Sequence, residues 1–201
     1  MTLVNKWTIF QLVQKWTGGH MKVLLLEGCR KGGNTDRLAD QFVKGAEEAG
    51  HEVIREYLFN KKMNGCIGCQ KCRNTDGTCI WNDDLVEVND EILNTDVIVF
   101  VSPVYFYGIP AQLKMAMDRT FNIEHHVHDK KVFFITSAAA PLGEEYEKKL
   151  QYAINTIQGW VDCYRNNVEL IKVIHAWNMW GEPDITKHVA YLEAYETGKN
   201  L

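Results

Sequence analysis

Short apolar runs alternate with segments of helical periodicity from Met21 onward. Strands are expected at 23–26, 53–58, 97–101, 132–136 and 168–174. Helices are expected at 35–49, 83–93, 110–121 and 144–161, with a last helix around Tyr195 that Asp184 caps. Because continuous apolar runs are typical of strands buried on both faces, the pattern predicts an α/β fold with a five-stranded parallel sheet between two helical layers.

The first twenty residues stand apart from this pattern. Apolar residues recur there at helical spacing and the segment ends at Gly18 and Gly19, which predicts one amphipathic helix. It is interpreted either as a leader ahead of Met21 or as a docking, dimerisation or membrane-surface helix. The domain organisation is therefore an N-terminal extension or leader at 1–20 and one domain at 21–201.

Net charge, apolar runs and cysteine usage indicate which classes of protein the chain belongs to. The 201 residues carry a net charge of −4, which disfavours a nucleic-acid partner, and no apolar run is long enough to span a membrane. Four of the six cysteines fall within fourteen positions, and the first twenty residues do not resemble a secretory signal. We therefore expect a reducing, cytoplasmic location in which these cysteines are ligands or redox groups, whereas Cys163 is expected to be a buried apolar residue.

The loop after the first strand has the chemistry of a phosphate site. Residues 28–35 place three glycines, two basic residues, Asn34 and Thr35 directly before a helix. Backbone amides at a helix N-terminus favour an anion. The loop matches neither the dinucleotide-binding G-x-G-x-x-G motif nor the P-loop, and the alternative is a tight glycine-rich turn on the surface.

The loop after the third strand is aromatic. Tyr105, Phe106 and Tyr107 follow Ser102 and Pro103 at the carboxyl end of an apolar strand, where α/β sheets bind ligands. This arrangement suits a flat ring ligand, and the alternative is aromatic packing beneath a helix.

Three motifs carry a resemblance to a known family. They are the phosphate loop, the aromatic loop with the downstream residues Ala111, Leu113, Lys114, Asp118 and Arg119, and a compact cysteine loop at 66–79 followed by Asp83 and Asp84. The chain resembles the NAD(P)H-dependent FMN reductase and iron–sulfur flavoprotein group of the flavodoxin-like superfamily over about 21–201, including a C-terminal Gly-x-Pro-Asp turn at 181–184. The resemblance implies a sheet order of 2-1-3-4-5 and a bound FMN. The phosphate loop is one residue shorter than in the family, and Cys29 stands where a hydroxyl would meet the phosphate.

The resemblance also implies which residues bind the cofactor. The phosphate is expected at the loop residues Cys29, Arg30, Lys31, Gly33, Asn34 and Thr35. The isoalloxazine ring is expected against Pro103, Val104, Tyr105 and Phe106, with Ser137 and Ala138 closing the other side. No catalytic side chain is expected, because the flavin carries the chemistry.

The cysteine loop has ligand spacing. Cys66, Cys69, Cys72 and Cys79 are separated by two, two and six residues, and four thiolates at such spacing can ligate a [4Fe–4S] cluster. Two alternatives remain: a flavin-proximal cap of empty thiols, or a zinc site, although zinc sites of four cysteines usually come as two separated pairs.

The functional expectation is an FMN-dependent NAD(P)H oxidoreductase of the flavin or quinone reductase type, with a small-molecule electron acceptor. The alternative is an iron–sulfur flavoprotein that exchanges electrons with a ferredoxin-like partner without oxidising NAD(P)H. A third hypothesis is a non-redox sensor or scaffold, which only the shortened phosphate loop supports. The resemblance further implies a homodimer or homotetramer.

Overall fold

The computed structural model describes residues 19–164, 166–181 and 184–201. The helix predicted within 1–20 lies outside the described residues except for its last two positions, and so do residues 182–183 of the predicted C-terminal turn.

Five parallel strands form one sheet in the order β2-β1-β3-β4-β5, which confirms the predicted order 2-1-3-4-5. The strands are β1 (Lys22–Glu27), β2 (Glu52–Tyr57), β3 (Val97–Pro103), β4 (Lys130–Ser137) and β5 (Val168–Ala176). The central strands β1 and β3 are almost wholly buried, as their continuous apolar runs predict. Since all strands are parallel, the loops after β1, β3 and β4 meet at one edge of the sheet.

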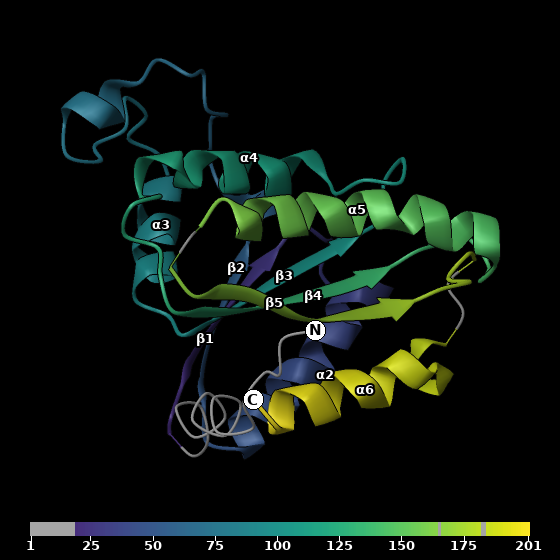
Figure 1. Ribbon diagram of the computed structural model, residues 1–201. Helices are drawn as coiled ribbons and strands as arrows, with labels where there is room; N and C mark the ends of the chain where they lie inside the picture. The colour runs from purple at the N-terminus through teal and green to yellow at the C-terminus, as the bar shows by residue number, and fades with distance from the viewer. Residues whose placement is uncertain (1–18, 165, 182–183) are drawn as a thin grey trace, which may run out of the picture.

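Helices cover both faces of the sheet (Figure 1). They are α2 (Asn34–Glu48), α3 (Leu85–Leu93), α4 (Ala111–Arg119), α5 (Glu144–Asp162) and α6 (Val189–Lys199). Helices α2 and α6 lie below the sheet in Figure 1, and α4 and α5 lie above it. The buried residues of α3 pack in the same core as those of α4 and α5. Each layer encloses its own apolar core against the sheet, because the strand side chains alternate between the two faces.

Helices α2 and α6 pack with their backbones in contact. A Cβ atom added at Gly45 in α2 would lie 2.1 Å from the carbonyl oxygen of Tyr195. A Cβ atom added at Gly198 in α6 would lie 2.0 Å from the carbonyl oxygen of Phe42. These two glycines therefore allow α2 and α6 to pack closely, and the two helices form the layer that carries the N-terminus of α2.

Three local predictions differ from the structure. The helix expected over 110–121 ends at Arg119 and continues as a 3-10 turn at Thr120–Asn122. Asp184 caps a short 3-10 turn, Ile185–Lys187, while His188 accepts the first hydrogen bond of α6. The prediction that Cys163 is buried was wrong: it follows the last residue of α5 and is exposed.

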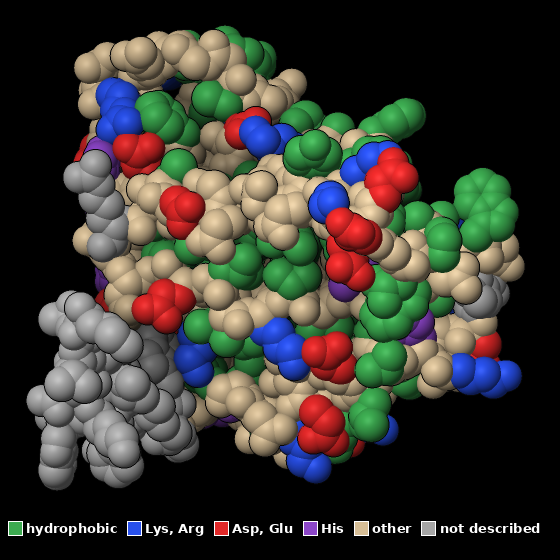
Figure 2. Space-filling model, turned by 45° about the vertical axis from the view of Figure 1, so that its right-hand side comes forward, with side chains coloured by type: hydrophobic (Ala, Val, Ile, Leu, Met, Phe, Trp, Pro, Cys, Tyr) green, Lys and Arg blue, Asp and Glu red, His purple; other side chains and the backbone are tan. Residues whose placement is uncertain are grey.

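The distribution of charge on the surface agrees with the small net charge of −4. On the face drawn in Figure 2, acidic and basic side chains intermingle with apolar ones. Among the described helices, the structure contains none with the length and apolarity to cross a membrane.

Candidate functional site

A pocket of about 200 Å³ lies at the carboxyl edge of the sheet. It is lined by segments that follow β1, β3, β4 and β5, in keeping with the ligand position of open α/β sheets. The lining residues are Cys29, Arg30, Gly33, Asn34, Thr35, Pro103, Val104, Tyr105, Ser137, Ala138, Ala139 and Met179. The structure thus brings together ten of the twelve residues expected at the cofactor; Lys31 and Phe106 are not among the lining residues.

The phosphate loop ends at the N-terminus of α2. Gly33 is the N-cap residue, and because it has no side chain the first amides of the helix receive no side-chain cap. Gly32 has a φ of +76°, a conformation that glycine adopts without strain. The uncapped amides and the exposed Arg30 provide donors and positive charge at one end of the pocket. This end can bind a phosphate.

A buried ionic cluster holds the phosphate loop against β1, β2 and α2. Glu27 at the end of β1 is fully buried and accepts hydrogen bonds from Arg55, with 2.5 Å between Nε and Oε1. The same guanidinium donates to Asp36 in the first turn of α2, at 2.8 Å, and to Asp40. Asp36 in turn accepts the amide of Gly32 at 2.6 Å. One arginine on β2 therefore ties β1, the loop and α2 together.

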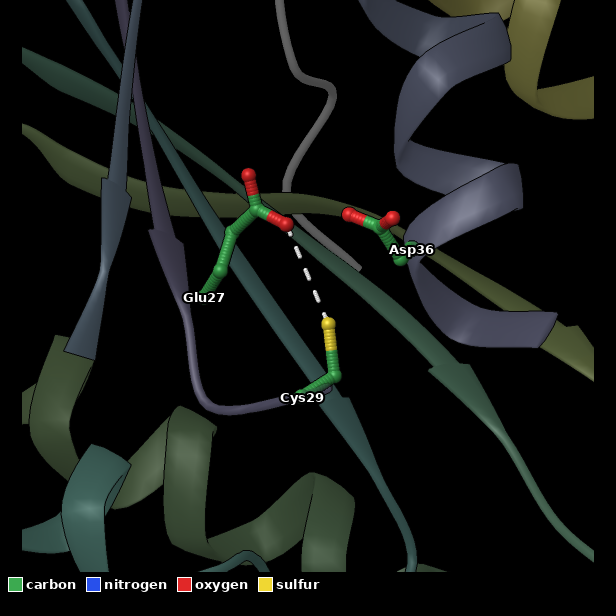
Figure 3. A group of neighbouring side chains, drawn as sticks. All are labelled: Glu27, Cys29 and Asp36. Atoms are coloured by element: carbon green, nitrogen blue, oxygen red, sulfur yellow. Dashed lines mark hydrogen bonds between the residues drawn. The ribbon is translucent and has the colours of Figure 1, made fainter. Parts of the chain in front are cut away.

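The thiol of Cys29 belongs to this cluster. Its sulfur lies 3.8 Å from Oε2 of Glu27, and Figure 3 shows it pointing toward that carboxylate with Asp36 nearby. Burial raises the pKa of the Cys29 thiol well above its ordinary range, so the thiol stays protonated. The group that stands in place of a hydroxyl therefore donates to Glu27, although Cys29 still lines the pocket.

Burial also raises the pKa of Glu27 to about 7, with the neighbouring Asp36 adding to the effect and Arg55 opposing it. The ligand atoms of Glu27, Cys29 and Asp36 lie within 4.8 Å of one another. The guanidinium of Arg55 already occupies the cation position between the two carboxylates. The trio is therefore a structural ionic cluster beneath the phosphate loop.

The aromatic loop forms a tight turn beside the pocket. Tyr105 and Gly108 exchange backbone hydrogen bonds of 2.9 and 2.8 Å, and both Phe106 and Tyr107 between them have positive φ angles. Bulky residues rarely adopt this conformation, so the turn is a strained element at the edge of the pocket. It leaves the ring of Phe106 fully exposed next to the pocket.

The far wall of the pocket is fixed by short contacts between α2 and the segments at and beyond the ends of β3, β4 and β5. The Thr35 and Ser137 hydroxyls lie 2.6 Å apart, and the amide of Val104 donates to the carbonyl of Ser137 at 3.0 Å. The amide of Met179 donates to the carbonyl of Ala138 at 2.9 Å, which brings the segment after β5 to the pocket. Sequence reasoning missed Met179 and Ala139, because neither position belongs to a motif.

The four loop cysteines line a second cavity. Cys66, Cys69, Cys72 and Cys79 share it with Ile67, Gln70, Ile80, Trp81, Arg119, Phe121 and Asn122. The loop stands out from the body of the molecule beyond α4 (Figure 1). All four predicted ligands therefore face one space.

The sulfur atoms of the loop are more widely spaced than those of a tetrahedral zinc site. A tetrahedral zinc site with bonds of about 2.3 Å holds its sulfurs about 3.8 Å apart. Within the described part of the chain, no three of the four loop sulfurs lie within 4.8 Å of one another. A multinuclear cluster spreads its thiolates over several irons and does not require them so close together.

The chain is similar to known proteins of one family and of related names. The family described as NADPH-dependent FMN reductase matches residues 21–162. An iron–sulfur flavoprotein of Methanocaldococcus jannaschii is 41% identical over 101 residues, covering 50% of this chain and 52% of that protein. An iron–sulfur flavoprotein of Archaeoglobus fulgidus is 34% identical over 101 residues, covering 50% and 46%. The chain thus spans about half the length of these curated relatives.

The fold also matches solved structures. The NAD(P)H:quinone oxidoreductase from Methanothermobacter marburgensis superposes with a TM-score of 0.71 at 17% identity, covering 90% of this chain and 99% of that one. At this identity the match concerns the fold, which confirms the flavodoxin-like architecture predicted from the sequence.

Proposed function

The chain belongs to the NADPH-dependent FMN reductase family, and we propose that it is an FMN-dependent oxidoreductase that takes electrons from NAD(P)H and passes them to an acceptor. The observation that carries the proposal is the pocket at the carboxyl edge of the sheet, where an uncapped helix N-terminus adjoins an aromatic turn. When bound, FMN supplies hydride and single-electron chemistry.

The residues that line the pocket fit FMN in two parts. Arg30, Asn34, Thr35 and the first amides of α2 offer the charge and the donors that a phosphate needs. Pro103, Val104 and Tyr105 on one side, with Ser137 and Ala138 on the other, are expected to enclose the ring. Phe106 is exposed beside this wall and is available to cover the ring or a nicotinamide.

The binding of FMN is tested by a pair of arginine variants. Arg30 lines the pocket, whereas Arg37 lies three residues into α2, is exposed and does not line it. Each change to alanine removes one positive charge from the same end of α2. We expect Arg30→Ala to weaken FMN binding by about tenfold, the effect of a lost charge-assisted hydrogen bond of about 1.5 kcal/mol, and Arg37→Ala to change it little. Equal affinities in a flavin fluorescence titration contradict this assignment.

A second function is favoured by the cysteine cavity. Cys66, Cys69, Cys72 and Cys79 would hold a [4Fe–4S] cluster, which supplies one-electron transfer when bound. The chain would then act as an iron–sulfur flavoprotein that exchanges electrons with a ferredoxin-like protein. The first two curated relatives described above carry that name, which supports this alternative.

Anaerobic purification separates the two functions. A flavin spectrum with about four irons and matching sulfide per chain establishes the cluster. Cys69→Ser should lose iron, while Cys163→Ser, a change at an exposed thiol outside the cavity, should retain it. Oxidation of NADH or NADPH by the purified protein, followed by absorbance, supports the reductase, and its absence in an iron-loaded protein supports the electron carrier.

The remaining assignments belong to the same proposal. A quinone or another small molecule is the expected acceptor of the reductase, and a homodimer or homotetramer in the cytoplasm is the expected setting. Protein that stays colourless after addition of FMN would instead support a non-redox sensor or scaffold.

A further inference from the structure

Arg119 holds both ends of the cysteine loop. It is the last residue of α4 and is almost fully buried. Its Nη1 donates to the carbonyl of Asn64 at 2.9 Å, before the first cysteine, and to Asp83 at 2.8 Å, after the last. Its Nη2 donates to the carbonyl of Trp81 at 3.4 Å. The guanidinium therefore holds the two ends of the cysteine loop against α4.

Two N–H groups in this region lack acceptors. Nε of Arg119 and Nε1 of Trp81 are buried and find no hydrogen-bond partner among the described residues. Both residues line the cavity that the four cysteines share. Leaving a buried donor unpaired costs about 1–3 kcal/mol, so two such donors in one cavity indicate an acceptor that occupies it.

The side-chain acceptors that line the cavity are the four cysteine sulfurs and the amide oxygens of Gln70 and Asn122. Ile67, Ile80 and Phe121 contribute apolar walls. The amide oxygen of Asn122 already accepts a hydrogen bond from Asn89 at 2.7 Å. Gln70 lines the cavity but is exposed to solvent. Trp81 and Arg119, each with an unpaired buried N–H, therefore line the same cavity as the four cysteine sulfurs and whatever those sulfurs ligate.

We propose that Nε1–H of Trp81 and Nε–H of Arg119 donate hydrogen bonds to sulfur atoms of the cluster held by the four cysteines, and thereby raise its reduction potential. This inference rests on the cluster described under the proposed function. Reduction adds one electron to the cluster and breaks no bond. An N–H dipole directed at a sulfur stabilises that added negative charge, so each donor favours the reduced state.

Trp81 provides the clean test, because Arg119 also carries the buried ion pair with Asp83. Trp81→Phe removes the N–H and keeps an aromatic ring. Trp160→Phe is the matched control: its Nε1 donates to Thr120 at 3.0 Å in the core and does not line the cysteine cavity. Both variants are purified anaerobically with FMN, and the midpoint potential of the cluster is measured by electron paramagnetic resonance during reductive titration.

We expect the reduction equilibrium of the cluster in Trp81→Phe to fall by about tenfold, which for one electron is a shift of about 59 mV to lower potential. Trp160→Phe should match the wild type. An unchanged potential in an iron-loaded Trp81→Phe overturns the inference and leaves the cluster standing. Wild-type protein that binds FMN but takes up no iron and sulfide on anaerobic reconstitution overturns the cluster, and the inference with it.

A second measurement decides the case in which Trp81→Phe fails to hold the cluster. Wild-type protein labelled with nitrogen-15 tryptophan is reduced and studied by pulsed electron paramagnetic resonance. A hydrogen bond from the Trp81 indole places its nitrogen within coupling range of the cluster spin, so a tryptophan nitrogen signal is expected. The absence of that coupling in loaded wild-type protein contradicts the proposed bond.

Discussion

The contact between α2 and α6 makes a quantitative prediction about glycine. Gly45 in α2 lies so close to α6 that a Cβ atom there would be 2.1 Å from the carbonyl oxygen of Tyr195 and 2.8 Å from the amide nitrogen of Lys199. Both neighbours are backbone atoms inside a helix, so neither can rotate away. Gly45→Ala must therefore move one helix by about 1 Å to reach ordinary van der Waals contact.

The cost follows from two opposing effects. Replacing glycine by alanine in a helix interior gains about 1 kcal/mol of helix propensity. Overpacking a tight contact costs about 1–3 kcal/mol, and more where the backbone must shift. We therefore expect a net loss of about 2 kcal/mol for Gly45→Ala, which lowers Tm by about 4–8 °C in a protein of this size.

Gly159 is the matched control. It lies in α5, is exposed, and has no atom within 4 Å of an added Cβ. Gly159→Ala should gain about 1 kcal/mol and raise Tm by about 2–4 °C. Thermal unfolding is followed by circular dichroism at saturating FMN, so that cofactor loss does not confuse the comparison. A Gly45→Ala variant that melts at or above the wild type would show that α2 and α6 accommodate the added methyl group without a clash.

Three further predictions concern the two sites. Gly32→Ala places a Cβ at a φ of +76° in the phosphate loop, and a strain of about 1 kcal/mol should weaken FMN binding about fivefold in a fluorescence titration. Asp83→Asn leaves Arg119 buried without its counter-ion and should lower the urea unfolding free energy by about 3–5 kcal/mol; an unchanged midpoint would contradict this. The pKa of Glu27 rises from 4.5 to about 7 on folding, so the stability contributed by its bound proton is fully present below pH 4.5 and is lost as pH rises to about 7. In urea titrations at each pH, the wild-type unfolding free energy should fall by an amount on the order of 3 kcal/mol across that window, and Glu27→Gln should not show this fall.

The sheet and the pocket were predictable because each depends on local sequence. The apolar run at 97–101 is long enough only for a buried strand, and it became the centre of β3. Once the strands are parallel, the loops after β1 and β3 must meet at one edge. Ten of the expected cofactor residues line one pocket for this reason.

The features that the sequence did not predict depend on contacts between distant segments. Glu27 and Arg55 lie 28 residues apart, and nothing in either strand indicates that their charges pair in the interior. Cys163 was expected inside because free cysteine is usually buried, yet it follows the end of α5, where the chain leaves the core. Met179 reaches the pocket only because the segment after β5 folds back onto Ala138.

Helix α4 joins the two sites into one unit. It begins just after the aromatic turn that borders the pocket and ends at Arg119, which holds the cysteine loop. Midway along it, Met115 lies 3.9 Å from the position of a Cβ added at Gly65, beside the first cysteine. Nine residues of helix span about 14 Å, so a short rigid element fixes the cavity relative to the pocket.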